Sequence, residues 1–326
     1  MKIAVTGASG HLGAAIIPIL INRGYSVKAL VRDRIPAADN PSIEIVNGDL
    51  LNTEALNALL INCTALIHCA AVISVNGDTK GIVHQTNVEG TKMLLETAQQ
   101  CGIKRVVHIS SIHAYEQQTG SMVLDEQSRL VNEHAFAYDR SKKAGQEIAL
   151  SMNSETMEVL VMNPTSIIGP YDYKPSKMGK VIIDLYNGRL PFIFNGGFDF
   201  CNSTDVACAV VNALNMGTPG QNYILSGKWH SLQELTTFLS AAAQKKIKPF
   251  MLPEVIGKAA LPIVKTMAWL NKKEPFYTIE AMEALYAGNK NISSDKAKEQ
   301  LGYTVQPFET TIHDTLTWFK KIGYIV

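Results

Sequence analysis

The sequence predicts an α/β fold in which a parallel sheet is wound with helices on both faces. Short, unbroken apolar runs alternate with longer amphipathic runs between Met1 and about Asn163, and a glycine-rich turn directly follows the first apolar run. Strands of a parallel sheet are buried on both faces, and each needs a helix to return the chain to the next strand. The 326 residues suffice for one such domain and a smaller companion.

The individual elements follow one another in the order that such a fold needs. Strands are expected at Lys2–Thr6, Val27–Val31, Glu44–Asn47, Ala65–His68, Val106–Ser110 and Glu158–Met162, and helices at Leu12–Arg23, Gly81–Cys101 and Ala137–Met152. Gly24 and Gly102 stand just past two of these helices, where glycine commonly ends a helix.

After Pro164 the pattern becomes less regular and glycines and prolines cluster. One more strand is expected at Asn222–Leu225, and helices at Ser231–Ala243 and Thr311–Lys321. We therefore expect residues 1–170, rejoined by residues 199–227, to form the doubly wound domain. Residues 171–326 are expected to form a smaller, mostly helical subdomain.

Composition and charge favour a globular protein that acts on a small molecule. Apolar residues make up 46% and charged residues 18%, and the formal net charge is +1, so no overall field attracts nucleic acid or an anionic membrane. The apolar stretch from Pro253 to Leu270 is interrupted by charges and by Pro262, so it fails as a membrane span.

The cysteines are odd in number, widely spaced and without a nearby histidine cluster, which argues against a metal site or a disulfide framework. They are Cys63, Cys69, Cys101, Cys201 and Cys208. The first apolar run, Ile3-Ala4-Val5, begins only two residues into the chain, which leaves no room for a signal peptide. We expect a cytoplasmic protein with reduced thiols.

The glycine-rich turn predicts a dinucleotide-binding Rossmann domain. Glycines let the backbone turn sharply and approach a pyrophosphate, which then rests on the N-terminus of the following helix. A tight turn without a ligand is the alternative interpretation. The expected contacts are Thr6, Gly7, Ser9, Gly10, His11, Leu12 and Gly13.

The end of the second strand distinguishes the two nicotinamide cofactors. NAD-specific folds place a carboxylate there for the ribose 2′-hydroxyl, but Val31 cannot accept a hydrogen bond. Arg32 follows, and its guanidinium suits a 2′-phosphate, so we expect NADP(H). Asp33 leaves NAD open, and Arg32 as a plain surface charge is the alternative.

Two further strand ends are expected to border the cofactor. Asp49 and Leu50 follow the third strand, where a side chain reaches the adenine, and the small residues Cys69, Ala70 and Ala71 leave space after the fourth strand.

The catalytic residues are expected on the helix Ala137–Met152 and at the end of the fifth strand. Tyr138 and Lys142 are four residues apart and share one helix face. The pKa of a phenol is about 10. Lowering it by about three units takes about 4 kcal/mol, which a neighbouring ammonium and a cationic nicotinamide can supply together. Ser111 lies at a sheet edge where ligands bind and can hold the substrate oxygen toward Tyr138.

The residues after Ser111 are expected to meet the substrate. These are Ile112 and His113. The apolar stretch Leu252–Leu270 suggests a hydrophobic lid over a ketone, an aldehyde or a steroid-like carbonyl, with ordinary core packing as the alternative.

With these motifs in their order, the chain resembles the extended short-chain dehydrogenase/reductase family, most of all its dihydroflavonol-reductase-like and 3β-hydroxysteroid-dehydrogenase-like branch. The motifs are the Thr-Gly-x-x-Gly-x-x-Gly turn, Asp49-Leu50, His68-Cys69-Ala70-Ala71, Asn87, Ser111, Tyr138, Lys142, and the Asn163–Pro170 segment. The resemblance implies that Ser111, Tyr138 and Lys142 form the catalytic triad, that Asn163, Pro164 and Thr165 border the nicotinamide, and that the enzyme is a monomer or a homodimer.

Two other functions compete with an NADP-dependent reductase or dehydrogenase. A nucleotide-sugar epimerase would use the same triad, but a substrate diphosphate prefers arginine and the chain has none after Arg189. A dehydratase of this family would carry an Asp-Glu pair where Ile112-His113 stands. A redox sensor that only binds NADP would usually lack Tyr138 or Lys142.

Overall fold

In a computed structural model of the chain, residues 1–32, 40–78, 80–117, 122–253 and 278–326 are described. The α/β fold with a doubly wound parallel sheet is confirmed. Its seven strands stand in the order β10-β6-β5-β4-β1-β2-β3, and every pairing between them is parallel. These strands are β1 (Lys2–Thr6), β2 (Ser26–Val31), β3 (Ile43–Asn47), β4 (Ala65–His68), β5 (Arg105–Ile109), β6 (Glu158–Pro164) and β10 (Gln221–Leu225).

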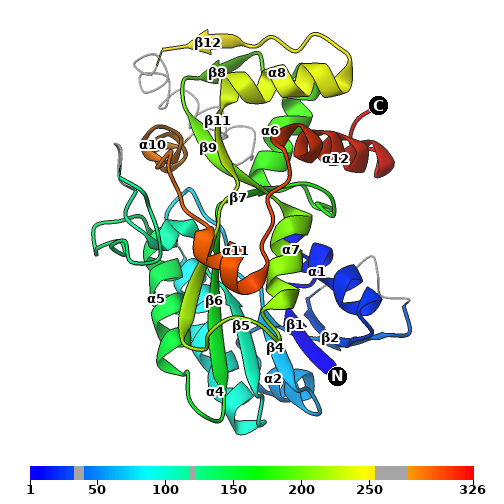
Figure 1. Ribbon diagram of the computed structural model, residues 1–326, viewed down its shortest axis with the longest axis vertical. Helices are drawn as coiled ribbons and strands as arrows, with labels where there is room; N and C mark the ends of the chain where they lie inside the picture. The colour runs from blue at the N-terminus through cyan, green and yellow to red at the C-terminus, as the bar shows by residue number, and fades with distance from the viewer. Residues whose placement is uncertain (33–39, 79, 118–121, 254–277) are drawn as a thin grey trace.

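Two layers of helices cover the sheet, one on each face (Figure 1). One layer holds α1 (His11–Asn22), α7 (Ser203–Asn212) and α11 (Asp295–Leu301). The other holds α2 (Thr53–Leu60), α4 (Gly90–Gln100) and α5 (Ala137–Ser151). Successive side chains of a strand point to opposite faces, so each face buries its own apolar core. Ile3 and Val5 of β1 therefore pack in one core and Ala4 packs in the other.

The order of the strands reverses between β1 and β4. The chain proceeds outward from β1 through β2 to β3 on one side, and through β4, β5 and β6 on the other. Connections diverge at such a point, which leaves a crevice beyond the carboxyl ends of the two strands where α/β proteins bind ligands. The glycine turn follows β1 and Cys69 follows β4, so both predicted cofactor segments border this crevice.

A second part of the molecule lies above the carboxyl ends of the main sheet (Figure 1). It contains two small sheets that the sequence analysis did not predict, ordered β11-β9-β7 and β12-β8. Their strands are β7 (Ser166–Ile168), β8 (Phe192–Phe194), β9 (Gly197–Asn202), β11 (Lys228–Ser231) and β12 (Phe250–Leu252). Most are only three or four residues long, too short to show a reliable alternation along the chain.

Helices complete this second part and share one apolar core with its strands. They are α6 (Lys177–Tyr186), α8 (Leu232–Ala243), α10 (Ile279–Ala287) and α12 (Phe308–Lys321). Because β10 joins the main sheet beside β6, the chain returns to the sheet well after residue 170. The division at residue 170 stays a prediction, and residues 254–270 of the expected apolar lid Leu252–Leu270 lie outside the described residues.

One predicted helix differs in detail from the structure, and one helix of the main domain was missed. The expected helix Gly81–Cys101 is divided into α3 (Ile82–His84), a π-helical segment η1 (Gln85–Glu89) and α4. Helix α2 was not predicted, since its eight residues span barely two turns. It nevertheless begins with a side-chain cap, because the Asn52 side chain accepts a hydrogen bond from the Ala55 N–H.

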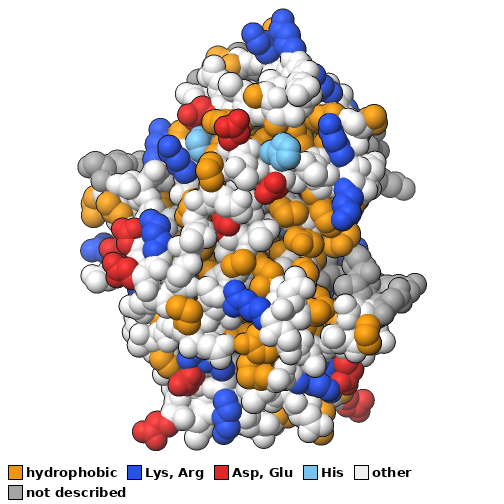
Figure 2. All heavy atoms as spheres, turned by 45° about the vertical axis from the view of Figure 1, so that its right-hand side comes forward, with side chains coloured by type: hydrophobic (Ala, Val, Ile, Leu, Met, Phe, Trp, Pro, Cys, Tyr) orange, Lys and Arg blue, Asp and Glu red, His pale blue; other side chains and the backbone are white. Residues whose placement is uncertain are grey.

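Charged side chains of both signs are spread over the face shown in Figure 2, in keeping with the net charge of +1. Within the described ranges, no helix combines the length and the apolar character that crossing a membrane requires.

Shortening a side chain at the centre of the sheet should lower the stability of the whole domain. Leu66 of β4 is 0% exposed, so Leu66→Ala leaves a cavity and is expected to cost about 2–5 kcal/mol of unfolding free energy, measured by urea denaturation. Leu51→Ala is the control, because Leu51 is 44% exposed and its loss should change stability by about 0.5 kcal/mol or less. Equal effects of the two substitutions would contradict the burial of β4.

Candidate active site

The glycine turn packs tightly against the segment that follows β4. Gly7 has a φ of +70°, and a Cβ placed on it would lie 2.6 Å from the backbone N of Ala70. A Cβ on Gly13 would lie 2.2 Å from the carbonyl oxygen of Gly7. Both positions therefore need glycine, for the left-handed conformation in one case and for the close approach of helix and turn in the other.

The start of α1 suits a phosphate group. Gly10, the N-cap residue, has no side chain to cap the helix, and the first backbone N–H bonded within the helix is that of Ala14, which donates to the Gly10 oxygen. The preceding N–H groups of the first turn have no partner within the helix, and the helix dipole favours an anion there. The turn thus fits the pyrophosphate of a dinucleotide.

His11, predicted in this turn, bonds to another part of the chain. Its Nε2 lies 3.0 Å from the Pro170 carbonyl oxygen and its Nδ1 lies 3.9 Å from the Asp172 carboxylate. Burial lowers the pKa of His11. The imidazole therefore links the turn to the segment after β7, and the backbone of the turn is left to supply the donors that a phosphate would need.

The other predicted cofactor contacts divide into exposed and buried side chains. Arg32 is exposed directly after β2, whereas Val31 is buried, and Asp33 lies outside the described residues. Asp49 is exposed and its carboxylate accepts a hydrogen bond from the Leu51 N–H at 2.9 Å. Leu50 packs into the core beneath Gly90, so its side chain contributes packing rather than a polar contact.

The structure brings the three predicted catalytic residues together beyond the end of β5. Ser111 caps the short 3₁₀ turn η2 (Ile112–Ala114), where its hydroxyl accepts the His113 N–H at 3.2 Å, and it lies near enough to the Tyr138 phenol to act on its pKa. Lys142 is 5% exposed, and its Nζ donates to the Ile109 carbonyl oxygen at 2.8 Å. Ser110 has a different role, because its hydroxyl donates to the backbone oxygen of Lys142 and ties β5 to α5.

The electrostatics of the pair differ from the expectation. Burial raises the pKa of Tyr138 to about 12, although the nearby Ser111 hydroxyl opposes this rise, and burial lowers the pKa of Lys142 to about 8. Desolvation disfavours the charged form of each group. The residues of the chain alone thus keep the phenol protonated, and they do not produce the lowered pKa that the Tyr/Lys spacing predicted.

A carboxylate and an imidazole flank the phenol. His113 Nδ1 lies 3.0 Å from the Asp139 carboxylate, and the His113 ring meets the Tyr138 ring edge-on with centroids 5.5 Å apart. His113 therefore stands beside the phenol, and its contact with a substrate stays a prediction. Ile112 instead packs in a small buried cluster with Ala114 and Leu124, so its predicted contact with the substrate has no support from this packing.

The end of β6 bonds to the loop that carries Ser111, and the residue after β6 bonds to β9. The Asn163 amide donates to the Ser111 carbonyl oxygen at 3.0 Å, while its own Oδ1 is buried without a hydrogen-bond partner in the described part of the chain. The Thr165 hydroxyl donates to Asp199 at 2.7 Å. An unsatisfied buried acceptor is costly, so Asn163 Oδ1 is open to a donor such as a carboxamide.

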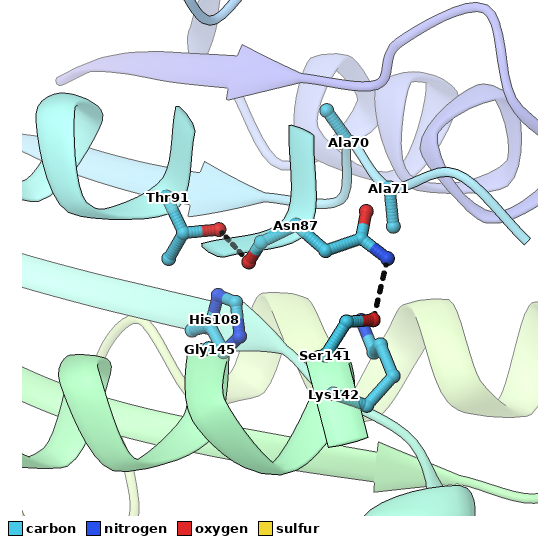
Figure 3. A pocket seen from close by; sticks show the side chains of 8 residues that line it. All are labelled: Ala70, Ala71, Asn87, Thr91, His108, Ser141, Lys142 and Gly145. Carbon is cyan, nitrogen blue, oxygen red and sulfur yellow. Dashed lines mark hydrogen bonds between the residues drawn. The ribbon is translucent and has the colours of Figure 1, made fainter. Parts of the chain in front are cut away.

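Asn87 is a site residue whose role the sequence did not reveal. It lies in the π-helical segment η1 and lines a small pocket together with Ala70, Ala71, Thr91, His108, Ser141, Lys142 and Gly145 (Figure 3). Its amide donates to Ser141 Oγ at 2.9 Å. The available signal was a short polar side chain inside a helical pattern, which often marks only a local hydrogen bond.

Metal-ion sites and cysteines are two further kinds of group that could take part in catalysis. The described residues hold no group of three or more histidine, cysteine or acidic side chains placed to share a metal ion. All five cysteines are unpaired, and burial raises the pKa of the Cys69 thiol to about 12, so this thiol beside the crevice is not a thiolate at neutral pH.

Comparison with known proteins agrees with this geometry. A family model described as the NAD dependent epimerase/dehydratase family matches residues 3–226. Sterol demethylase protein B of Methylococcus capsulatus is 27% identical, with 100% of both chains covered. A putative dihydroflavonol 4-reductase of Synechocystis sp. is 30% identical over 98% of this chain and 95% of the relative. The crystal structure of gox2253 matches with a TM-score of 0.85 and 28% identity, covering 100% of this chain and 99% of that one.

Burial of Lys142 should leave a signature in the pH dependence of stability. Below about pH 8 the Lys142 amine is protonated in both the folded and the unfolded chain, so the whole cost of burying its charge lowers the free energy of unfolding. Between about pH 8 and 10.5 the unfolded chain still binds a proton that the folded protein has released. The cost therefore shrinks as the pH rises through this range and is gone above it. We expect Lys142→Met to raise the Tm at pH values below about 8, and the gain to shrink toward pH 10.5.

The matched control is Lys92→Met, because the Lys92 side chain is 63% exposed on α4. Its Tm should follow that of the wild type at every pH. A gain from Lys142→Met that stays constant with pH would show that Lys142 does not carry a buried charge.

Proposed function

Because the chain belongs to the NAD-dependent epimerase/dehydratase family, we propose that it is an NADP-dependent oxidoreductase that reduces a ketone or aldehyde, or oxidises the corresponding alcohol. The family match confirms the resemblance inferred from the motifs, and the chain is an enzyme of this nicotinamide-dependent family. The observation that supports the proposal most is the grouping of Ser111, Tyr138 and Lys142 at the crevice of the sheet.

The proposed chemistry assigns one task to each side chain. Bound NADPH supplies a hydride to the carbonyl carbon. The Ser111 hydroxyl hydrogen-bonds the carbonyl oxygen and holds it against the Tyr138 phenol, which donates its proton to that oxygen. Burial keeps this phenol protonated, which is the form that reduction needs. The Lys142 ammonium, one helical turn further along α5, stabilises the phenolate that remains.

The proposed substrate is largely apolar. Two full-length relatives carry names that refer to a sterol and to a dihydroflavonol, molecules without a phosphate. The chain has no arginine after Arg189, and arginine is the preferred partner of a diphosphate. His113, held by Asp139 beside the phenol, is proposed to contact a polar group of the substrate. We also propose a cytoplasmic monomer or homodimer, in line with the unpaired cysteines.

Turnover of carbonyl compounds tests the proposal directly. NADPH absorbance would be followed with a panel of ketones and aldehydes that includes a ketosteroid and a dihydroflavonol. We expect at least one of them to be reduced, and Tyr138→Phe to lower the rate by about 100-fold or more while NADPH affinity changes little.

The same assay separates the competing functions. Conversion of UDP-glucose without net NADPH consumption would favour an epimerase. Tight NADPH binding with no turnover of any compound would favour a sensor.

The choice of cofactor depends on Arg32. If the guanidinium bonds the 2′-phosphate, Arg32→Ala should weaken NADPH by about tenfold or more, equivalent to about 1.5–3 kcal/mol, and leave NADH nearly unchanged. Cofactor fluorescence titrations measure both affinities. Arg189→Ala is the control, because Arg189 pairs with Asp184 at 2.8 Å in the upper part of the molecule. Equal weakening of both cofactors by Arg32→Ala would refute NADP specificity.

A further inference from the structure

A buried histidine, His68, lies between the cofactor turn and the catalytic helix. It is 1% exposed at the end of β4, and both ring nitrogens are bonded to threonine hydroxyls. Nδ1 lies 2.6 Å from Thr6 Oγ1 on β1, and Nε2 lies 3.0 Å from Thr91 Oγ1 on α4. The imidazole thus joins three elements that are far apart in the sequence.

The donors and acceptors along this chain of bonds have only one consistent arrangement. The Thr91 hydroxyl donates to the Asn87 carbonyl oxygen at 2.8 Å, so its oxygen must accept from His68, and Nε2 carries the hydrogen. Nδ1 is then the acceptor for the Thr6 hydroxyl, whose oxygen in turn accepts the Ala70 N–H at 3.3 Å. A neutral imidazole has one donor and one acceptor nitrogen, and this network uses both.

Burial holds the ring in that neutral form. Desolvation lowers the pKa of His68 to about 3, with the Lys142 ammonium as a smaller contribution in the same direction. The titratable groups that face the ring are His108 on β5 and Lys142 on α5, and both disfavour a second positive charge. The network therefore keeps its direction over the whole range of physiological pH.

Asn87 continues the chain of bonds to the catalytic helix (Figure 3). Its Oδ1 accepts from the Val72 N–H at 2.8 Å, and its amide donates to the Val72 oxygen and to Ser141 Oγ, both at 2.9 Å. The Ser141 hydroxyl donates to the carbonyl oxygen of Tyr138 at 2.7 Å. Side chains thus connect the strand that carries the glycine turn to the backbone of the proposed catalytic tyrosine.

The helix is distorted at the point where this network enters it. Asn87 lies in η1, where the hydrogen-bonding pattern widens to that of a π-helix. Such segments cost local stability and occur mainly where a side chain has to be placed for function. Here the distortion lets the Asn87 side chain reach Val72 and Ser141 while its carbonyl oxygen receives the Thr91 hydroxyl.

We propose that His68 is a positioning residue which, through Thr91 and Asn87, sets the place of α5 and hence of the Tyr138 phenol relative to the cofactor crevice at Ala70. The kinetic part of this inference rests on the proposed function, while the structural part does not. His68 acts through other residues and touches no reacting atom.

The chain offers a matched control in His108. It pairs with His68 in the register of β4 and β5, is 3% exposed, and has its ring centroid 5.1 Å from that of His68. Neither of its ring nitrogens has a hydrogen-bond partner within the described part of the chain. Replacing it removes a buried imidazole of the same size without breaking the network.

The kinetic test compares four variants. Thr91→Val removes the hydroxyl and keeps the shape, and it is expected to lower kcat for carbonyl reduction by about tenfold with NADPH affinity within about threefold. Thr91→Ser keeps the hydroxyl and should stay within about threefold of the wild-type kcat. His68→Leu should behave like Thr91→Val and lose at least about threefold more of kcat than His108→Leu does. Wild-type kcat in Thr91→Val, or an equal loss in His108→Leu, would overturn the proposal.

Two measurements need no substrate and so separate this inference from the proposed function. In ¹⁵N-histidine-labelled protein, the His68 signals, assigned with His68→Leu, should show the neutral Nε2–H tautomer from about pH 5 to about pH 8. A titrating ring, or a hydrogen on Nδ1, would overturn the network.

Hydrogen–deuterium exchange tests the position of the helix itself. Amides at the start of α5 should exchange faster in Thr91→Val and His68→Leu than in Thr91→Ser and His108→Leu. Equal exchange in all four variants would show that the network does not hold α5, whatever the enzyme reduces.

Discussion

The close approach of Gly7 to the backbone after β4 is the constraint on which the rest of the structure depends. A side chain at Gly7 would meet Ala70 N at 2.6 Å, so the turn after β1 and the segment after β4 can lie together only if this residue is glycine. Their contact closes the floor of the crevice at the reversal point of the sheet. It also fixes where the proposed dinucleotide would meet the start of α1, and therefore where α5 has to place the phenol that we propose to be catalytic.

In the site at the edge of this crevice, burial disfavours the charged forms of both the Tyr138 phenol and the Lys142 amine. Burial raises the pKa of the Tyr138 phenol and lowers that of the Lys142 ammonium, so both groups are drawn toward their neutral forms. Lys142 keeps a hydrogen bond to the Ile109 carbonyl oxygen as partial compensation. A buried ammonium reduces stability. The proposed proton transfer, rather than the fold, therefore explains why Lys142 stands one helical turn from the phenol.

Buried polar side chains next to the site connect the cofactor segment to α5, and in our proposal they align the two. The parallel strands carry Thr6 and His68 at their carboxyl ends, and the π-helical segment η1 presents Asn87 to both the cofactor segment and α5. Each buried donor and acceptor in this chain of bonds has a partner, which is the condition under which a buried polar network specifies one geometry. Leu66 on the strand of His68 and Leu94 on the helix of Thr91 are buried in the apolar core of that face of the sheet.

The amino-acid pattern by itself determined the doubly wound sheet, its strands, the glycine turn and the spacing of Tyr138 and Lys142. Each of these depends on local properties, namely apolar runs, β-branched residues, helical periodicity and the freedom of glycine. Only the tertiary structure decided which polar groups meet. The bonds of His68 to Thr6 and Thr91 join residues 62 and 23 positions apart. The packing of Ile112 away from solvent and the direction of the Tyr138 pKa shift likewise depend on how the folded chain surrounds these side chains. Burial and hydrogen bonding between distant segments have no periodicity along the sequence, so no local pattern contains them.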